Sequence, residues 1–200
     1  MSSSNPFRPA RFVLSAADLR QLPADAGAEV VFAGRSNAGK SSALNAICDQ
    51  AGLARTSKTP GRTQLLNVFA VDATRRLVDL PGYGYAKVPE AMRERWRGLI
   101  DAYLRERHSL RGVVLIMDGR HPLREFDRQM LAFCTAIGRG CHVLLTKADK
   151  LSRSEAARTL AAVRKECAAQ HWNAGVQLFS ALSGAGVDAA RTALQALLDA

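Results

Sequence analysis

The fold of this chain is decided by the stretch Glu29-Val30-Val31-Phe32-Ala33-Gly34-Arg35-Ser36-Asn37-Ala38-Gly39-Lys40-Ser41. Its first residues form the mostly apolar run expected of a buried strand, and the rest fits the pattern Gly-x-x-x-x-Gly-Lys-Ser. A helix is expected over 40–50, because Leu44, Ile47 and Cys48 share one of its faces. A glycine-rich turn between a strand and a helix directs backbone N–H groups and the helix N-terminus at one point. The stretch therefore predicts a loop that cradles phosphate.

Short apolar runs alternate with longer helical patterns in the rest of the chain. Strands are expected at residues 64–71, 75–80, 112–117, 142–145 and 176–179, and helices at 89–108, 122–137, 152–170 and 187–198. The short turn at 72–74 makes the first two of these strands an antiparallel pair. The pattern predicts a three-layer α/β fold, with a six-stranded, mostly parallel sheet that has one antiparallel strand and helices on both faces. We expect an N-terminal extension over 1–22, a single domain over 23–200, and ligands at the carboxyl ends of the strands.

Charge is the most unusual bulk property. The 200 residues include 28 Lys and Arg against 18 Asp and Glu, which gives a net charge of +10 and a pI of about 10.1. Such an excess favours polyanions such as nucleic acid or a ribonucleoprotein. The alternative is that Arg-rich, solvated helices keep the protein soluble.

Several classes of protein are disfavoured by the composition. No apolar run approaches the roughly 20 residues of a membrane span, and the polar N-terminus lacks the apolar core of a secretory signal. We therefore expect a cytoplasmic protein with no membrane partner. A monomer is a separate expectation. The four cysteines lie outside any Cys-x-x-Cys pair and are expected to be buried free thiols: Cys48, Cys134, Cys141 and Cys167.

Two elements point to a triphosphate and its metal. In the loop pattern, Lys40 is expected to hold the β- and γ-phosphates, and the Ser41 hydroxyl to bind Mg²⁺ directly. Further on, Asp79-Leu80-Pro81-Gly82 follows an apolar strand. Asp79 is expected to hold Mg²⁺ through water, and the Gly82 N–H to bond the γ-phosphate. Asp-x-x-Gly alone is usually a turn, and its place after the phosphate loop gives it weight.

The segment expected to recognise the nucleotide base is Thr146-Lys147-Ala148-Asp149, which follows another buried strand. A carboxylate at Asp149 accepts hydrogen bonds from guanine N1–H and the 2-amino group, donors that adenine lacks. Lys147 is expected to lay its stem over the base, while Thr146 stands where Asn is commoner and braces the loop through its hydroxyl. Phe179-Ser180-Ala181-Leu182 follows the last strand and offers backbone N–H groups to the guanine carbonyl.

A second protein ligand to Mg²⁺ is expected from the loop between the first helix and the next strand. Thr56, Thr59 and Thr63 compete for this role. We choose Thr63, because it follows Pro60-Gly61-Arg62 and directly precedes a strand, so that it can swing onto the metal.

This ordered set resembles the translation-factor-related small GTPases, within the group that includes TrmE, Era, EngA and the septins. The strings Ser57-Lys58-Thr59-Pro60-Gly61-Arg62-Thr63-Gln64 and Asp79-Leu80-Pro81-Gly82-Tyr83-Gly84-Tyr85-Ala86 resemble, more particularly, the bacterial EngB family, also called YihA or YsxC. The resemblance covers about 12–198. It implies a GTPase that binds GTP, GDP and Mg²⁺ and acts in assembly of the large ribosomal subunit. It also implies rRNA and ribosomal proteins as partners, and a link to cell division and septation.

The site expected on this basis has a nucleotide shell, a catalytic set and a metal set. The nucleotide shell comprises Gly34, Arg35, Ser36, Asn37, Ala38, Gly39, Lys40, Ser41, Gly61, Arg62, Thr63, Gln64, Leu65, Asp79, Leu80, Pro81, Gly82, Thr146, Lys147, Ala148, Asp149, Phe179, Ser180 and Ala181. The catalytic set is Lys40, Thr63, Gly82 and Asn37, and the metal set is Ser41, Thr63 and Asp79.

Hydrolysis is expected to be slow without a partner. Tyr83 stands directly after Asp-x-x-Gly, where small GTPases often place the Gln that orients the attacking water. Arg35 and Arg62 lie near the nucleotide in sequence, but neither is an obvious arginine finger. In related GTPases, an Asn at the place of Asn37 can coordinate K⁺ in that role. The alternative is that Asn37 only braces the loop.

Arginines are candidates for the contact surface. Arg93 and Arg97 are expected one helical turn apart, as are Arg120, Arg124 and Arg128 in the following segment. Solvated helix faces look the same in sequence. Two rival functions remain: an ATP-dependent kinase, which has no use for Asp149, and a non-hydrolysing RNA-binding module, which leaves the nucleotide motifs unexplained.

Overall fold

A seven-stranded sheet forms the centre of the computed structural model, which describes residues 5–54, 65–83 and 90–200. In those residues the strands lie in the order β1 (Arg11–Ala16), β3 (Leu66–Ala70), β4 (Arg75–Asp79), β2 (Ala28–Gly34), β5 (Leu110–Asp118), β6 (Gly140–Thr146) and β7 (Ala174–Leu178). Of the described strands, β3 runs antiparallel to both its neighbours, while β4, β2, β5, β6 and β7 are parallel. The mostly parallel sheet with one reversed strand is therefore confirmed.

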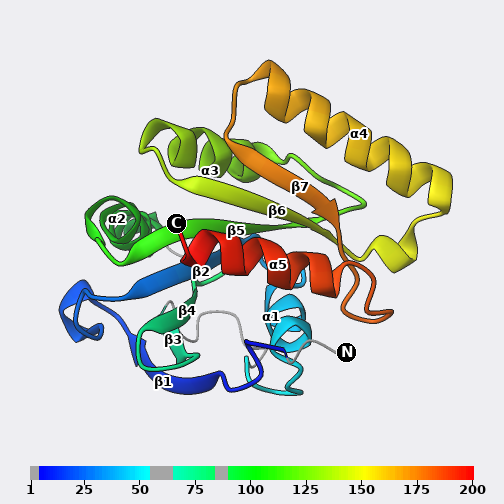
Figure 1. The fold of residues 1–200 in the computed structure, drawn as a ribbon. Coiled ribbons are helices and arrows are strands. Elements are labelled where there is room, and N and C mark those ends of the chain that lie inside the picture. Colours follow the sequence, from blue (N-terminus) through cyan, green and yellow to red (C-terminus); the bar gives the residue numbers. More distant parts are fainter. Residues whose placement is uncertain (1–4, 55–64, 84–89) are drawn as a thin grey trace.

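Helices cover both faces of the sheet (Figure 1). One face carries α1 (Lys40–Cys48) and α5 (Val187–Leu198), and the other carries α2 (Glu90–Glu106), α3 (Glu125–Ala136) and α4 (Arg153–Ala169). The side chains of β5 point alternately to the two faces, and apolar residues on each face need a cover of helices. Val114 and Ile116 pack in the core beneath α1 and α5, whereas Val113 and Leu115 pack beneath the other three helices. The three-layer α/β class is confirmed.

The expected number of strands was one too low. The strand missed is β1, which lies in the segment 1–22 that was expected to be an extension. Phe12 and Val13 are exposed by 53% and 44%, so the segment lacks the clear alternation of a half-buried strand. Pairing with β3 holds β1 in place, and the rings of Phe12 and Phe69 lie 5.9 Å apart. The described part of 1–22 is thus built into the sheet, with Phe7 fully buried.

Local signals set the remaining boundaries. Either Ser152 or Ser154 is a possible cap for α4, and the structure selects Ser152, whose hydroxyl accepts the Glu155 N–H at 3.3 Å.

All four cysteines are buried and free, as expected. In the described ranges, no helix is long and apolar enough to cross a membrane, and no cluster of His, Cys, Asp and Glu is suited to a metal.

Candidate functional site

The glycine-rich loop turns between β2 and α1 at the carboxyl end of the sheet. Gly39 caps α1 with a φ of 98°, in the left-handed region where a side chain is strained, and Asn37 has a φ of 62°. These turns bring the backbone from the end of β2 into the first turn of α1. The first turn of a helix has unpaired N–H groups, so the loop has the form expected of a phosphate cradle.

The segment after β4 is joined to this loop by backbone hydrogen bonds. The Ser36 N–H donates to the Tyr83 carbonyl at 2.9 Å, and the Tyr83 N–H donates to the Gly34 carbonyl at 3.3 Å. A Cβ at Gly82 would lie 3.1 Å from the Ser36 backbone, which is tighter than ordinary contact. Glycine at position 82 therefore allows the two segments to approach each other closely.

Lys40 and Asp79 form an ion pair in this region, with side chains that are only 11% and 8% exposed. Burial raises the pKa of Asp79, and the adjacent Lys40 ammonium opposes that effect. Ser41 follows Lys40 in the first turn of α1. A serine hydroxyl and a carboxylate are oxygen donors of the kind that Mg²⁺ prefers, so these residues fit that ion.

Thr146 connects the end of β6 to the loop. Its side chain is buried, and its hydroxyl lies within hydrogen-bond distance of the carbonyls of Ala38 and Met117, the latter at 3.0 Å. A hydroxyl has one proton, so it donates to one of these acceptors at a time. The expected bracing of the loop by Thr146 is therefore present in the structure. The hydroxyl of Thr makes this contact without the side-chain amide that the commoner Asn would bring.

Lys147 bridges three segments of the chain. Its ammonium donates to the Asn37 carbonyl at 2.7 Å and pairs with Asp118 at 2.9 Å. Arg120 also pairs with Asp118 and, together with Lys147, lowers the pKa of that carboxyl. Asp118 is absent from the expected site. Its position directly after the buried run 112–117 is the signal that could have identified it.

Asp149 and Ser180 meet across the ends of β6 and β7. The Ser180 hydroxyl donates to the Asp149 carboxylate at 2.6 Å and lowers its pKa. The Ala148 N–H donates to the Phe179 carbonyl at 3.2 Å, which joins the backbones of the same two loops. The two expected guanine segments thus form one unit.

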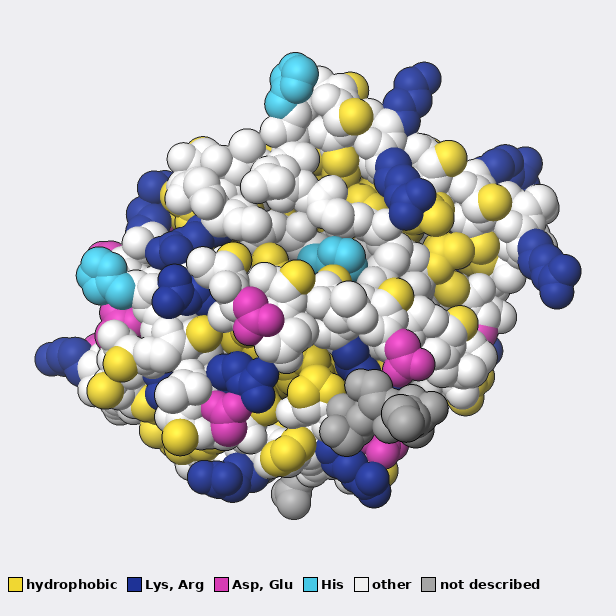
Figure 2. All heavy atoms as spheres, in the orientation of Figure 1, with side chains coloured by type: hydrophobic (Ala, Val, Ile, Leu, Met, Phe, Trp, Pro, Cys, Tyr) yellow, Lys and Arg dark blue, Asp and Glu magenta, His cyan; other side chains and the backbone are white. Residues whose placement is uncertain are grey.

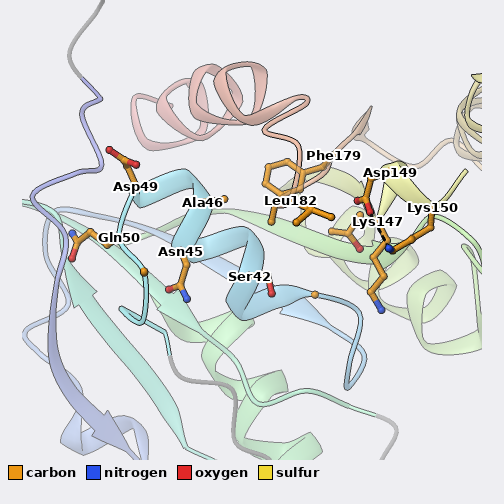
Figure 3. Close-up of a pocket in the computed structure, with 14 residues that line it drawn as sticks. Ser42, Asn45, Ala46, Asp49, Gln50, Lys147, Asp149, Lys150, Phe179 and Leu182 are labelled. Carbon is orange, nitrogen blue, oxygen red and sulfur yellow. Dashed lines mark ion pairs between the residues drawn. The ribbon is translucent and has the colours of Figure 1, made fainter.

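A cavity of about 760 Å³ lies between α1 and this unit, with α1 on one side and the loops after β6 and β7 on the other (Figure 3). Its walls include Gly39 of the phosphate loop together with Asp149 and Ala181. Ser42 and Asn45 of α1 also line it, although the sequence pattern did not single them out. A volume of this order suits a nucleotide-sized ligand.

The expected site is only partly covered by the described residues. Gly61, Arg62, Thr63 and Gln64 lie outside them, so their placement stays a prediction. Leu65 is half-buried just before β3. The Leu80 N–H donates to the Phe32 carbonyl at 3.0 Å, which places the segment that continues through Pro81 beside the end of β2.

The arginine series expected after β5 does not form one helical face. α3 begins at Glu125, so Arg120 lies before the helix and Arg124 is its N-cap. Arg120 pairs with Asp118, and Arg128 pairs with Glu166. Figure 2 shows Lys and Arg side chains scattered around one face of the molecule, with several near α4, rather than gathered in a single patch.

Comparison with known sequences identifies the family. The family described as "50S ribosome-binding GTPase" matches residues 29–147. The chain is 59% identical over 182 residues to a "Probable GTP-binding protein EngB" of Aromatoleum aromaticum, covering 91% of this chain and 84% of that protein. A protein of the same name from Shewanella amazonensis is 54% identical over 198 residues, with 97% and 89% covered.

Comparison with solved structures supports the fold. A crystal structure of a probable GTP-binding protein EngB has a TM-score of 0.65 at 20% identity, covering 86% of this chain and 99% of that one. Era of Aquifex aeolicus, in complex with GDP and AlF4⁻, has a TM-score of 0.64 at 19% identity, with 87% and 56% covered. By its sequence identity to the relatives and the extent of the family match, the chain belongs to the EngB family of GTP-binding proteins, within the ribosome-binding GTPases.

Proposed function

We propose that this protein is a slowly hydrolysing GTP switch that acts in assembly of the large ribosomal subunit and is linked to normal cell division and septation. One observation carries the nucleotide part of the proposal. Gly39 of the phosphate loop and Asp149 line the same cavity, and Thr146 and Lys147 both contact the phosphate loop. Groups suited to phosphate and to guanine therefore line one cavity and are joined by hydrogen bonds.

Base selection is assigned to Asp149. Its carboxylate has two oxygens, which suit the two neighbouring donors of guanine. Adenine offers neither donor, so ATP should compete poorly. Displacement of a fluorescent GDP by unlabelled GTP, GDP and ATP tests this assignment. Equal displacement by ATP and GTP would favour the kinase class instead.

Mg²⁺ is assigned to Ser41 and Thr63 as direct ligands and to Asp79 through water. When bound, the ion offsets charge on the phosphate oxygens during phosphoryl transfer. Lys40 contributes a fixed positive charge to the β- and γ-phosphates, and the Gly82 N–H is the sensor of the γ-phosphate. A Lys40→Ala variant should lose nucleotide binding altogether.

Slow intrinsic hydrolysis is proposed because Tyr83 replaces the water-orienting Gln and its side chain is buried. Asn37 is proposed to coordinate K⁺, with bracing of the loop as the alternative. Hydrolysis measured in KCl and NaCl at equal ionic strength, with ribosomal particles present, separates the two. Equal rates in the two salts would argue against a catalytic K⁺.

The ribosomal role rests on the family and on the net charge of +10. Co-sedimentation with large-subunit particles in GTP, GDP and no nucleotide tests it. Binding should be strongest with GTP and should fall steeply with rising salt, because phosphate contacts release counterions. The Lys40→Ala variant is the control. If it bound as well as the unchanged protein in every condition, the RNA-binding module without a switch would be the better description.

A further inference from the structure

Three polar residues lie in a row across the edge of the sheet. Asn67 on β3 is directly opposite Ser15 on β1 and directly opposite Asp79 on β4. Residues paired in this way across antiparallel strands project from the same face and contact each other. The row therefore leads from the outermost strand, β1, to the carboxylate proposed to hold Mg²⁺ through water.

The hydrogen bonds of the row have a definite direction. The Ser15 hydroxyl donates to Asn67 Oδ1 at 2.6 Å. Asn67 also lies opposite Asp79, and its side chain is one of the groups that oppose the rise in pKa which burial gives to that carboxyl. A carboxylate only accepts, and the amide oxygen already accepts from Ser15, so the NH₂ group is the part of Asn67 that can serve Asp79. Ser15 thus stabilises the one amide orientation that serves Asp79.

Within the described residues, Asp79 therefore has an ion-pair partner on one element and a polar cross-strand neighbour on another. Lys40 pairs with it from α1, and Asn67 lies opposite it in the sheet. Under the proposed function, Lys40 turns to the β- and γ-phosphates when a triphosphate binds. A buried carboxylate that loses its donors is strongly destabilised, and among the described residues Asn67 offers Asp79 an amide NH₂ group that does not depend on the phosphate loop.

We propose that Asn67 is a positioning residue that holds the Asp79 carboxylate in place for the metal when Lys40 is engaged with phosphate, and that Ser15 fixes the orientation of Asn67. This inference rests on the proposed function. It gives β1, a strand outside every nucleotide motif, an indirect part in metal binding.

Retention of a fluorescent, non-hydrolysable GTP analogue, measured as its dissociation rate over a series of Mg²⁺ concentrations and in EDTA, tests the inference. Asn67→Ala should raise the Mg²⁺ concentration for half-maximal retention roughly 10–100-fold, the effect of losing one hydrogen bond to a charged group. Ser15→Ala should raise it by about 2–3-fold, since the amide keeps its place but loses its orienting donor. The dissociation rate in EDTA should stay unchanged in both variants.

Asn173→Ala is the matched control, because Asn173 is an exposed asparagine beside β7 at the opposite edge of the sheet. The Asn173→Ala variant should release the analogue at the same rate as the unchanged protein at every Mg²⁺ concentration and in EDTA. Ser15 is also exposed, so Ser15→Ala should fold even if Asn67→Ala does not.

The outcomes separate the two proposals. If the unchanged protein depends on Mg²⁺ and both variants follow the same curve, the positioning role is overturned and the proposed function stands. Equal changes in Mg²⁺ and in EDTA would also overturn it, because they would indicate a purely structural role. If the unchanged protein binds the analogue without regard to Mg²⁺, the metal part of the proposed function fails together with this inference.

Discussion

The Tyr83 hydroxyl donates a hydrogen bond of 3.1 Å to the Asp127 carboxyl group in the interior of the protein. Asp127 also accepts the Arg124 N–H at 3.0 Å at the start of α3. Burial raises the pKa of both the Tyr83 and the Asp127 side chains. The residue that follows Gly82 is thus tied to α3, and its hydroxyl is engaged there.

Replacement of Tyr83 by Phe tests whether this bond is structural. The variant keeps the ring and leaves Asp127 with one hydrogen bond fewer. The free energy of unfolding in urea should fall by about 1–2 kcal/mol, the cost of one buried bond. The rate of GTP hydrolysis should stay within about twofold of the rate of the unchanged protein, because the charged groups around the phosphates are unchanged. A tenfold loss of hydrolysis with unchanged stability would contradict this prediction and would place the hydroxyl in the chemistry.

Thr146→Val tests the brace between β6 and the phosphate loop. Valine has nearly the same shape but no hydroxyl, so the hydrogen bond that the hydroxyl donates to either the Ala38 or the Met117 carbonyl is lost. GDP affinity, measured by fluorescence titration, should fall by roughly 5–10-fold, the equivalent of one buried hydrogen bond. Thr146→Ser keeps the hydroxyl, so its GDP affinity should stay within about twofold of that of the unchanged protein. Equal losses in the two variants would contradict this prediction, because the methyl group would then matter as much as the hydroxyl.

Ser180→Ala tests the support of Asp149. The hydroxyl orients the carboxylate by donating to it at 2.6 Å, so its loss should leave Asp149 less well ordered for guanine. GTP affinity should fall by about 5–10-fold, while the weak binding of ATP should stay the same. Ser183→Ala, in the same loop, is the control and should have little effect. Parallel losses for GTP and ATP would indicate a general disturbance of the cavity.

The sequence predicted the fold well where local pattern and tertiary structure agree. The apolar runs that became β2, β5 and β6 are buried on both faces, so they read as continuous hydrophobic strands. The motifs at their carboxyl ends are short and fixed in spacing, because backbone groups and single side chains must meet one ligand. Thr146 illustrates this, since its contact with the loop follows from its place as the last residue of β6.

Residues whose role depends on a partner far away in sequence were not predictable. β1 forms because β3 is beside it, and Asn67 gains its neighbours only when β1, β3 and β4 align. Arg128 looked like part of one basic face, yet it pairs with Glu166, a carboxylate 38 residues away that the periodicity does not reveal. Long-range pairing, rather than local propensity, decides all of these cases.

Acid stability offers a last prediction, at the end of the sheet away from the phosphate loop. Asp25 accepts the His108 N–H at 2.9 Å through one oxygen and the Ser109 N–H at 2.7 Å through the other, and Arg107 lies 3.5 Å away. Burial alone would raise its pKa, but these donors outweigh it and lower the pKa to about 2 from 3.8. The unfolded chain therefore takes up this proton first as the pH falls.

The stability that Asp25 contributes is fully present above its unfolded pKa and is lost as the pH falls from about 4 to about 2. Asp25→Asn lacks one of the two acceptor oxygens. Because Asp25 is partly exposed, the loss of stability should be limited to about 1 kcal/mol. The variant should therefore unfold about 2–4 °C below the unchanged protein at pH 7. Thermal unfolding followed by circular dichroism should show this gap closing as the pH approaches 2. Asp188→Asn, whose side chain is 93% exposed, should match the unchanged protein at each pH. A gap for Asp25→Asn that stayed constant from neutral to acid pH would assign its effect to packing instead of charge.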